Sequence, residues 1–264
     1  MPSTGDEILL EETSAGVRLL TLNLPDVRNA MTEELTARWT ETVEKLKTDR
    51  DVRALVVTGA GSSFCSGADL SFLDQGTAEH ITPDRLREKM IPFYDAWLLP
   101  RRLPVPVIAA VNGPAIGAGL CLALACDLRY ANHEAIFSAP FISLGTHGGM
   151  GVTRMLPEMI GLSRAREMLY TSRAVSADEA LQWGLVSGIA DDVVSHSLQI
   201  AEDIARAAPI ATRLTKAGLE QAALGLEASI QWEALAQPVT MATSDLHEGI
   251  QARRERRDAQ FEGH

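Results

Sequence analysis

The chain opens with short apolar runs of strand character and continues with apolar residues at helical spacing. Ile8 to Glu12 and Val17 to Leu24 predict two strands, joined as a hairpin by a Ser-Ala-Gly turn. A helix is then expected from Thr32 to about Lys47, because Thr32 fits an N-cap that acidic residues follow. Its apolar positions share one face: Leu35, Trp39, Val43 and Leu46.

The alternation of strand and helix recurs through the middle of the chain. The segment 76–102 is polar and contains Pro83 and Pro92, which predict a broken or kinked helix. Apolar and β-branched runs predict strands at 52–58, 106–111, 128–131 and 136–138. This pattern predicts an α/β fold whose core is built of stacked turns of strand and helix.

From Asp191 onward the pattern is helical. Before that point a glycine loop opens a predicted helix at 152–160, and Ser163 is expected to cap the next helix. Ser176 and Glu179 have the spacing of a capping box. The later helices are expected at 191–207, about 210–224, about 228–236 and 246–259.

Length, charge and cysteine content restrict the class of protein. With 264 residues, 46% apolar and 22% charged, the chain can form one large domain with a sizeable core. No apolar run reaches the ~18–20 residues of a membrane span, and no signal peptide is recognisable. The net charge of −11 argues against nucleic acid or an anionic membrane as a partner. Cys65, Cys121 and Cys126 are too few for a disulfide framework, so we expect a reduced, cytoplasmic protein.

The most informative stretch runs from Val111 to Asp127 and reads VNGPAIGAGLCLALACD. Ala118 to Ala125 contains no charged residue, which is typical of a buried helix. The helix would begin just after Gly117, and the free N–H groups of its first turn attract negative charge. Gly117 and Gly119 leave room for a ligand to approach the backbone, although such a helix is equally often a close-packing device.

A second stretch, Leu55 to Leu70, joins an apolar strand to a glycine-serine loop that ends in FCSGADL. Together, FCSGADL and NGPAIGAGLCLALACD resemble the paired signatures of the enoyl-CoA hydratase/isomerase family, the crotonases. Asp26 to Met31, Phe137 to Met150 and the tail Arg256 to Phe261 extend the resemblance over essentially the whole chain. Each segment alone is weak evidence for this family, whereas all five in the right order are strong evidence.

The resemblance implies a fold and a substrate class. The fold would be the crotonase-like spiral of ββα units, with a core at 1–200 that holds the site and a helical oligomerisation region at 201–264. The chain would form a homotrimer or a dimer of trimers. The substrate would be an acyl-CoA thioester, whose carbonyl oxygen would accept hydrogen bonds from the backbone N–H groups of Ala68 and Ala118. No cofactor is implied, and no metal-ligand spacing is present.

The chain departs from the family pattern at two positions that matter for chemistry. Hydratases of the family use two glutamates, and the resemblance places Cys121 and Phe141 where these would stand. Because a positioned acid or base contributes ~10²–10⁴ in rate, we expect poor hydratase activity. His147, on the glycine loop, is a candidate replacement for proton transfer. Cys121 is a candidate nucleophile, although so apolar a helix would raise its pKa and make it inert.

The resemblance also implies contacts to the substrate. Met90, Phe93, Tyr94 and Trp97 are candidates to line the acyl pocket, with ordinary packing as the alternative. Phe261 matches a residue that reaches the adenine site of a neighbouring subunit, but Glu262 follows it where family members often carry a lysine. The implied substrate or CoA contacts are Val27, Arg28, Ala30, Ser66, Leu70, Gly117, Phe141 and Phe261.

Three functions therefore remain open from the sequence. The first is an enzyme that combines the oxyanion hole with a helper other than glutamate, as in decarboxylation or thioester cleavage. The second is an acyl-CoA-binding protein without catalysis. The third is a hydratase that uses other groups.

Overall fold

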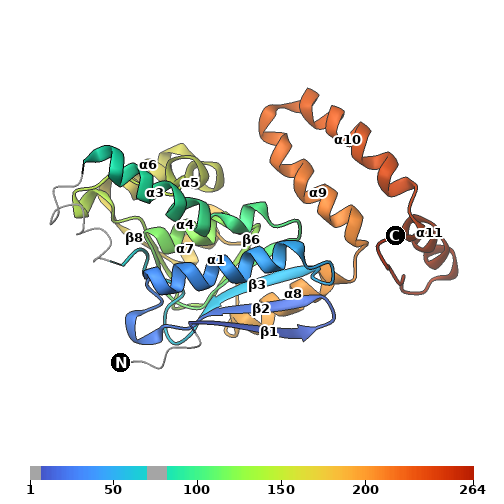
Figure 1. Cartoon of the computed structure of the whole chain (residues 1–264), viewed down its shortest axis with the longest axis horizontal. Coiled ribbons are helices and arrows are strands. Elements are labelled where there is room, and N and C mark those ends of the chain that lie inside the picture. The colour runs from blue at the N-terminus through green and yellow to red at the C-terminus, as the bar shows by residue number, and fades with distance from the viewer. Residues whose placement is uncertain (1–6, 70–81) are drawn as a thin grey trace.

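The computed structural model describes residues 7–69 and 82–264, and its strands form two sheets (Figure 1). The larger sheet has the order β1-β2-β3-β4-β6-β9. Only the β1–β2 pair is antiparallel, and it is the expected hairpin. The strands of this sheet are β1 (Ile8–Ser14), β2 (Val17–Leu22), β3 (Ala54–Gly59), β4 (Val107–Val111), β6 (Leu128–Ala131) and β9 (Gly188–Ile189).

The smaller sheet lies where the loop after β3 meets the segment between β4 and α4. It consists of β5 (Ala115–Ile116), β7 (Ile136–Ser138) and β8 (Ala174–Ser176), in that order. An isolated parallel bridge between Cys65 and Ala115 ties the loop after β3 to β5. The two stretches are therefore held together by backbone pairing rather than by side chains alone.

The larger sheet is covered on both faces, which explains why its strands are apolar without alternation. Leu55 and Val57 of β3 belong to the main core, which also receives side chains from α1 (Glu33–Thr48), α3 (Pro83–Trp97) and α4 (Ala118–Ala125). Ala54 and Val56 point to the opposite face and pack against α8 (Val193–Ala205). Successive residues of one strand therefore serve two cores.

Further helices complete the chain. Between β7 and α8 lie α5 (Val152–Ile160), α6 (Leu162–Thr171) and α7 (Ala177–Trp183). After α8 come α9 (Pro209–Gln221), α10 (Leu226–Met241) and α11 (Ser244–Glu255). Figure 1 shows α9 and α10 as a hairpin that extends away from the sheets, with α11 and the C-terminus at its base.

The caps expected from the sequence are mostly present. Thr32 accepts the Leu35 N–H at 3.1 Å, and Ser176 with Glu179 forms the complete capping box. The expectation that Ser163 caps a helix is wrong, because α6 begins at Leu162 and Gly161 is its N-cap.

The expected break at Pro92 is absent, because α3 continues through it. The helix expected to end near 236 is also longer, because α10 continues through Pro238 to Met241. In each case the carbonyl that loses its donor belongs to an exposed residue, Glu88 or Ala234, where water can replace the lost bond.

The predicted division at residue 200 falls inside α8, where Val193, Ser197, Ala201 and Ala205 form one buried face. Among the helices described, none has the length and apolar character needed to cross a membrane.

Candidate active site

The loop after β3 and the start of α4 meet at Gly67 and Ala118. A Cβ atom added to Gly67 would lie 2.6 Å from the Ile116 carbonyl oxygen and 3.2 Å from the Ala118 nitrogen. The Ile116 N–H donates to the Cys65 carbonyl at 3.0 Å, which fixes the two segments in register. Gly67 has a φ of +96°, so both its backbone conformation and its lack of a side chain allow this approach.

Ala68 and Ala118, the two residues expected to supply N–H groups, therefore lie on adjacent backbone segments. Ala118 is the first residue of α4, and its N–H is one of the donors that the helix leaves unpaired. Within the ranges 7–69 and 82–264, neither N–H has a backbone or side-chain acceptor. The neighbouring N–H groups are occupied, since Ser66 donates to Arg28 at 3.0 Å and Gly117 donates to Ser138 at 2.9 Å.

The two glycines at the start of α4 have different roles. Gly117 has φ 55° and ψ −115°, and a Cβ there would meet nothing within 4 Å, so open space lies beside its Cα. A Cβ on Gly119 would lie 2.1 Å from the Cys65 carbonyl oxygen. Gly119 thus allows the helix to pack against the loop that carries Ala68, which is the close-packing role that the sequence left open.

Ala68 and Ala118 open into a small pocket of about 160 Å³. Its walls are mainly apolar and aromatic, and its titratable side chains are Tyr94 and His147. No carboxylate is found among the described residues that line it. The lining comprises Ser66, Gly67, Ala68, Met90, Phe93, Tyr94, Ile116, Gly117, Ala118, Pro140, Phe141, Leu144, Thr146, His147, Gly149 and Met150.

Cys121 lies behind this pocket and is fully buried in α4. Burial raises the pKa of its thiol to about 12, and its sulfur lies 3.7 Å from the Gly149 carbonyl oxygen. A thiol that stays protonated near neutral pH is a poor nucleophile, so a nucleophilic role for Cys121 stays a prediction that its burial disfavours. Phe141 lines the pocket and places a hydrocarbon ring there.

His147 and Tyr94 differ in how firmly they are held. His147 lines the pocket but is exposed, and no described residue hydrogen-bonds to its side chain. Tyr94 is half-buried on α3, and its ring contacts Phe93 edge-on with centroids 6.3 Å apart. The sequence predicted only that Tyr94 lines the acyl pocket, because the loop that contacts its hydroxyl lies more than fifty residues away in the chain. Trp97 is outside the pocket and packs in the core.

Several of the expected CoA contacts gather beside Ser66. The Ser66 hydroxyl donates to the Val27 carbonyl at 3.4 Å, so the short helix η1 (Pro25–Val27) borders the pocket rim. Arg28 is exposed, with no ion pair to a described residue, whereas Ala30 is buried beneath the loop. Leu70 lies outside the described residues.

Phe261 lies apart from these residues. Its ring packs near Gly249 of α11, and its carbonyl accepts a hydrogen bond from Arg53 at 2.9 Å. It lines a different cleft, beside the N-terminal ends of β2 and β3. Within one chain Phe261 therefore does not reach the pocket, and a contact to a neighbouring subunit stays a prediction.

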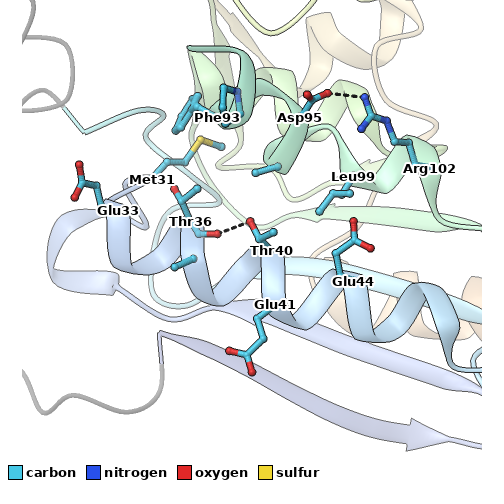
Figure 2. Close-up of a pocket in the computed structure, with 13 residues that line it drawn as sticks. Met31, Glu33, Thr36, Thr40, Glu41, Glu44, Phe93, Asp95, Leu99 and Arg102 are labelled. Carbon is cyan, nitrogen blue, oxygen red and sulfur yellow. Dashed lines mark hydrogen bonds and ion pairs between the residues drawn. The ribbon is translucent and has the colours of Figure 1, made fainter. Parts of the chain in front are cut away.

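A larger groove of about 870 Å³ runs between α1 and α3 (Figure 2). Thr36 and Thr40 face it, but their hydroxyls donate to carbonyls of their own helix at 2.7 Å. Asp95 and Arg102 form an ion pair across its edge at 2.6 Å. These four polar side chains are thus already paired, and among the described residues only Phe93 is shared with the pocket at Ala68 and Ala118. No cluster of metal-ligating side chains occurs within the described ranges.

Comparison with known proteins shows which family this chain resembles. The family model for enoyl-CoA hydratase/isomerase matches residues 12–264. The chain is 43% identical over 196 residues to a Mycobacterium tuberculosis protein named "probable enoyl-CoA hydratase EchA14", covering 74% of each chain. It is 38% identical to the (E)-benzylidenesuccinyl-CoA hydratase of Thauera aromatica, covering 96% of this chain and 98% of that protein.

A solved structure shares the whole architecture. The crystal structure of an enoyl-CoA hydratase from Bacillus anthracis superimposes with a TM-score of 0.92 at 32% identity, covering 98% of this chain and 100% of that one. The two sheets and the C-terminal helices described above are thus the architecture of these structures.

Proposed function

The chain belongs to the enoyl-CoA hydratase/isomerase family, and from this premise we propose that it acts on an acyl-CoA thioester bound between Ala68 and Ala118. The two backbone N–H groups would hydrogen-bond to the thioester oxygen and stabilise the enolate that forms when charge develops there. The observation that supports this most directly is the approach of Gly67 to Ala118 with both N–H groups left unpaired among the described residues. In comparable sites, removal of one such donor lowers the rate ~10²–10³-fold.

The proposed reaction does not depend on the two glutamates of family hydratases. Cys121 and Phe141 occupy the corresponding positions by sequence resemblance, and the described wall of the pocket contains no carboxylate. An oxyanion hole that lacks a neighbouring general base favours reactions in which the substrate forms the enolate by losing one of its own groups. Loss of carbon dioxide from a β-carboxyl thioester is such a reaction, whereas direct hydration requires a group that activates water.

The CoA part would lie along the rim formed by Val27, Arg28 and Ser66. Arg28 offers an exposed guanidinium without a described ion-pair partner, which suits a phosphate. Because the net charge is −11, attraction of a polyanion has to come from such local groups rather than from the overall field.

The acyl group would be small and apolar or aromatic. Met90, Phe93, Phe141 and Leu144 supply apolar walls, and the described space measures about 160 Å³. The name of the Thauera aromatica relative indicates a benzylidene-substituted acyl-CoA, which has an aromatic ring of the kind that such walls accept.

Assembly into a trimer, or a pair of trimers, is part of this proposal. The α9–α10 hairpin exposes large apolar side chains that a single chain leaves uncovered. They include Leu219, Leu224, Leu226, Leu235 and Met241. Light scattering on the purified protein tests this proposal, and a monomer at micromolar concentration would contradict it.

The test of the function is turnover and binding on one panel of thioesters. Crotonyl-CoA, cinnamoyl-CoA, malonyl-CoA and methylmalonyl-CoA are each assayed for turnover by mass spectrometry and for binding by calorimetry. Turnover of at least one thioester, lost in a variant that disturbs Ala68 or Ala118, supports the proposal. Tight binding without turnover of any thioester would instead identify an acyl-CoA-binding protein.

The double variant Cys121→Glu, Phe141→Glu examines the scaffold separately. If the two positions correspond to the family carboxylates, this variant should gain hydration of crotonyl-CoA. The single variants serve as controls, since one carboxylate supplies only part of the acid and base chemistry.

A further inference from the structure

The phenol of Tyr94 is the best-positioned proton donor among the described side chains of this pocket. We propose that Tyr94 delivers the proton that converts the enolate held at Ala68 and Ala118 into product. This inference rests on the proposed function, because it requires an enolate in the pocket. It names the group that replaces the missing acid.

The glycine loop shapes the position of the phenol. A Cβ atom on Gly149 would lie 2.4 Å from the Tyr94 hydroxyl oxygen and 2.9 Å from its ring carbon Cζ. The phenol therefore occupies the space that a side chain at residue 149 would fill. On the other side of the same residue, the Gly149 carbonyl oxygen faces the Cys121 sulfur at 3.7 Å. The phenol and the Cys121 thiol, where the family resemblance places a glutamate, therefore both lie against Gly149.

The hydroxyl oxygen has a polar neighbour in the backbone of the same loop. The backbone N–H of Met150 lies close enough to the Tyr94 oxygen to lower the pKa of the phenol in part. Among residues 7–69 and 82–264, no hydrogen bond is donated by the Tyr94 hydroxyl. A proton with no internal partner remains available for a group bound in the pocket.

The protonation state suits an acid rather than a base. Burial raises the pKa of Tyr94 above its ordinary value of 10, the nearby Cys121 raises it further, and the Met150 N–H partly opposes the shift. The phenol therefore stays protonated near neutral pH. An enolate carbon is a far stronger base than a phenolate, so transfer in this direction is favourable. His147 lacks such fixation, since it is exposed and unbonded among the described residues.

The proton transfer from Tyr94 to the enolate needs no other reactant than water. The Tyr94 O–H bond breaks as a C–H bond forms at the carbon next to the thioester carbonyl. The electron pair stays on the phenolate oxygen, where the Met150 N–H stabilises it. Water then returns a proton to the phenolate before the next turnover.

The experiment combines rate with the stereochemistry of protonation. Wild type and Tyr94→Phe are compared in D₂O on whichever of methylmalonyl-CoA, crotonyl-CoA and cinnamoyl-CoA the wild type turns over. Tyr94→Phe should lower kcat about 10²- to 10⁴-fold. Its residual product should carry deuterium in both configurations at the α-carbon, because solvent then supplies the proton from either face. The wild-type product should carry one configuration.

Three further variants separate the alternatives. Gly149→Ala should reproduce the effect of Tyr94→Phe, because the added methyl group displaces the phenol. Tyr170→Phe, the same change on the exposed surface of α6, should leave rate and configuration unchanged. His147→Gln should retain the single configuration.

If Tyr94→Phe kept full activity and gave a product of one configuration, the role of Tyr94 would be wrong while the proposed function stood. The same would follow if the His147→Gln product carried deuterium in both configurations. An inactive wild type would overturn the proposed function and the role of Tyr94 with it.

Discussion

The indole rings of Trp39 and Trp97 stack with their centroids 4.9 Å apart and their planes 16° apart. Each ring also donates its N–H to the opposite helix, Trp39 to the Ala96 carbonyl at 2.9 Å and Trp97 to the Thr36 hydroxyl at 3.1 Å. This reciprocal contact joins α1 to α3, the two helices that border the groove of Figure 2. Because α3 also carries Phe93 and Tyr94, the stack sets the position of one wall of the pocket.

Trp39→Ala should lower the free energy of unfolding by about 3–5 kcal/mol, because a fully buried indole leaves a cavity. Trp39→Phe retains an aromatic ring and should cost less, mainly the ~1 kcal/mol of the lost hydrogen bond to Ala96. Urea unfolding followed by circular dichroism measures both. Equal losses in the two variants would show that the hydrogen bond, rather than the ring, holds the helices together.

Gly67→Ala should reduce kcat/KM about 10²- to 10³-fold on any thioester that the wild type turns over. The added Cβ would lie 2.6 Å from the Ile116 carbonyl, so the backbone on either side, which carries the Ala68 and Ala118 N–H groups, has to shift. Gly161→Ala is the matched control. It has a similar positive φ of +77°, but its Cβ would meet nothing within 4 Å, so it should lose stability without losing activity.

The sequence predicted most of the local structure because local rules determine it. The strands at 128–131 and 136–138 and the helix at 152–160 lie where apolar periodicity placed them. Thr32 and Ser176 begin their helices as capping chemistry requires. The expected break at Pro92 and the expected helix end near 236 were wrong, because the effect of a proline in a helix depends on exposure of the residue four positions earlier, which a pattern does not reveal.

The site was predictable only in part, for a similar reason. Motif resemblance marked Ala68 and Ala118, whose approach requires small residues on both segments. The placement of the Tyr94 phenol depends on how α3 packs against the loop at Gly149, and no spacing in the sequence encodes that contact. Whether Phe261 serves a neighbouring chain also depends on assembly rather than on local pattern.

Alkaline pH should destabilise the protein through its buried thiols. Burial raises the pKa of Cys65, Cys121 and Cys126 to about 12 each, against an ordinary value of 9.0. Between pH 9 and pH 12 the unfolded chain releases these protons while the folded chain retains them, so stability falls as pH rises. Each thiol contributes a slope of about 1.4 kcal/mol per pH unit in that window.

The measurement is urea unfolding under reducing conditions from pH 8 to pH 10.5. Cys126→Ala should lower stability at pH 8, through lost packing, and should make the alkaline slope smaller by up to about 1.4 kcal/mol per pH unit, so that the difference from the wild type shrinks as pH rises. An unchanged slope in this variant would mean that the thiol ionises in the folded protein too.

Lys216 attaches the C-terminal helices to the core. Its ammonium group is buried on α9 and donates to the Asp127 carboxylate at 2.7 Å and to the carbonyls of Pro100 and Val105 at 3.0 and 2.9 Å. Lys216→Met removes the cation and leaves Asp127, among the described residues, with only the Val107 N–H donor at 2.7 Å, which should cost up to about 3–5 kcal/mol. Lys45→Met, which breaks an exposed pair with Glu41, should change stability by no more than ~1 kcal/mol.

Lys216→Met should loosen α9 before the sheets unfold, because the buried Lys216 links α9 to the core, and the remaining hydrogen bonds from Arg213 to the Arg50 and Val52 carbonyls are longer, at 3.1 and 3.3 Å. Limited proteolysis should therefore cleave the variant between α8 and α9 faster than the wild type, leaving a fragment that ends near residue 206. Mass spectrometry identifies the cut. Cleavage inside α8 instead would contradict this attachment and would favour a division nearer residue 200, since α8 packs on the sheet through Val193, Ala201 and Ala205.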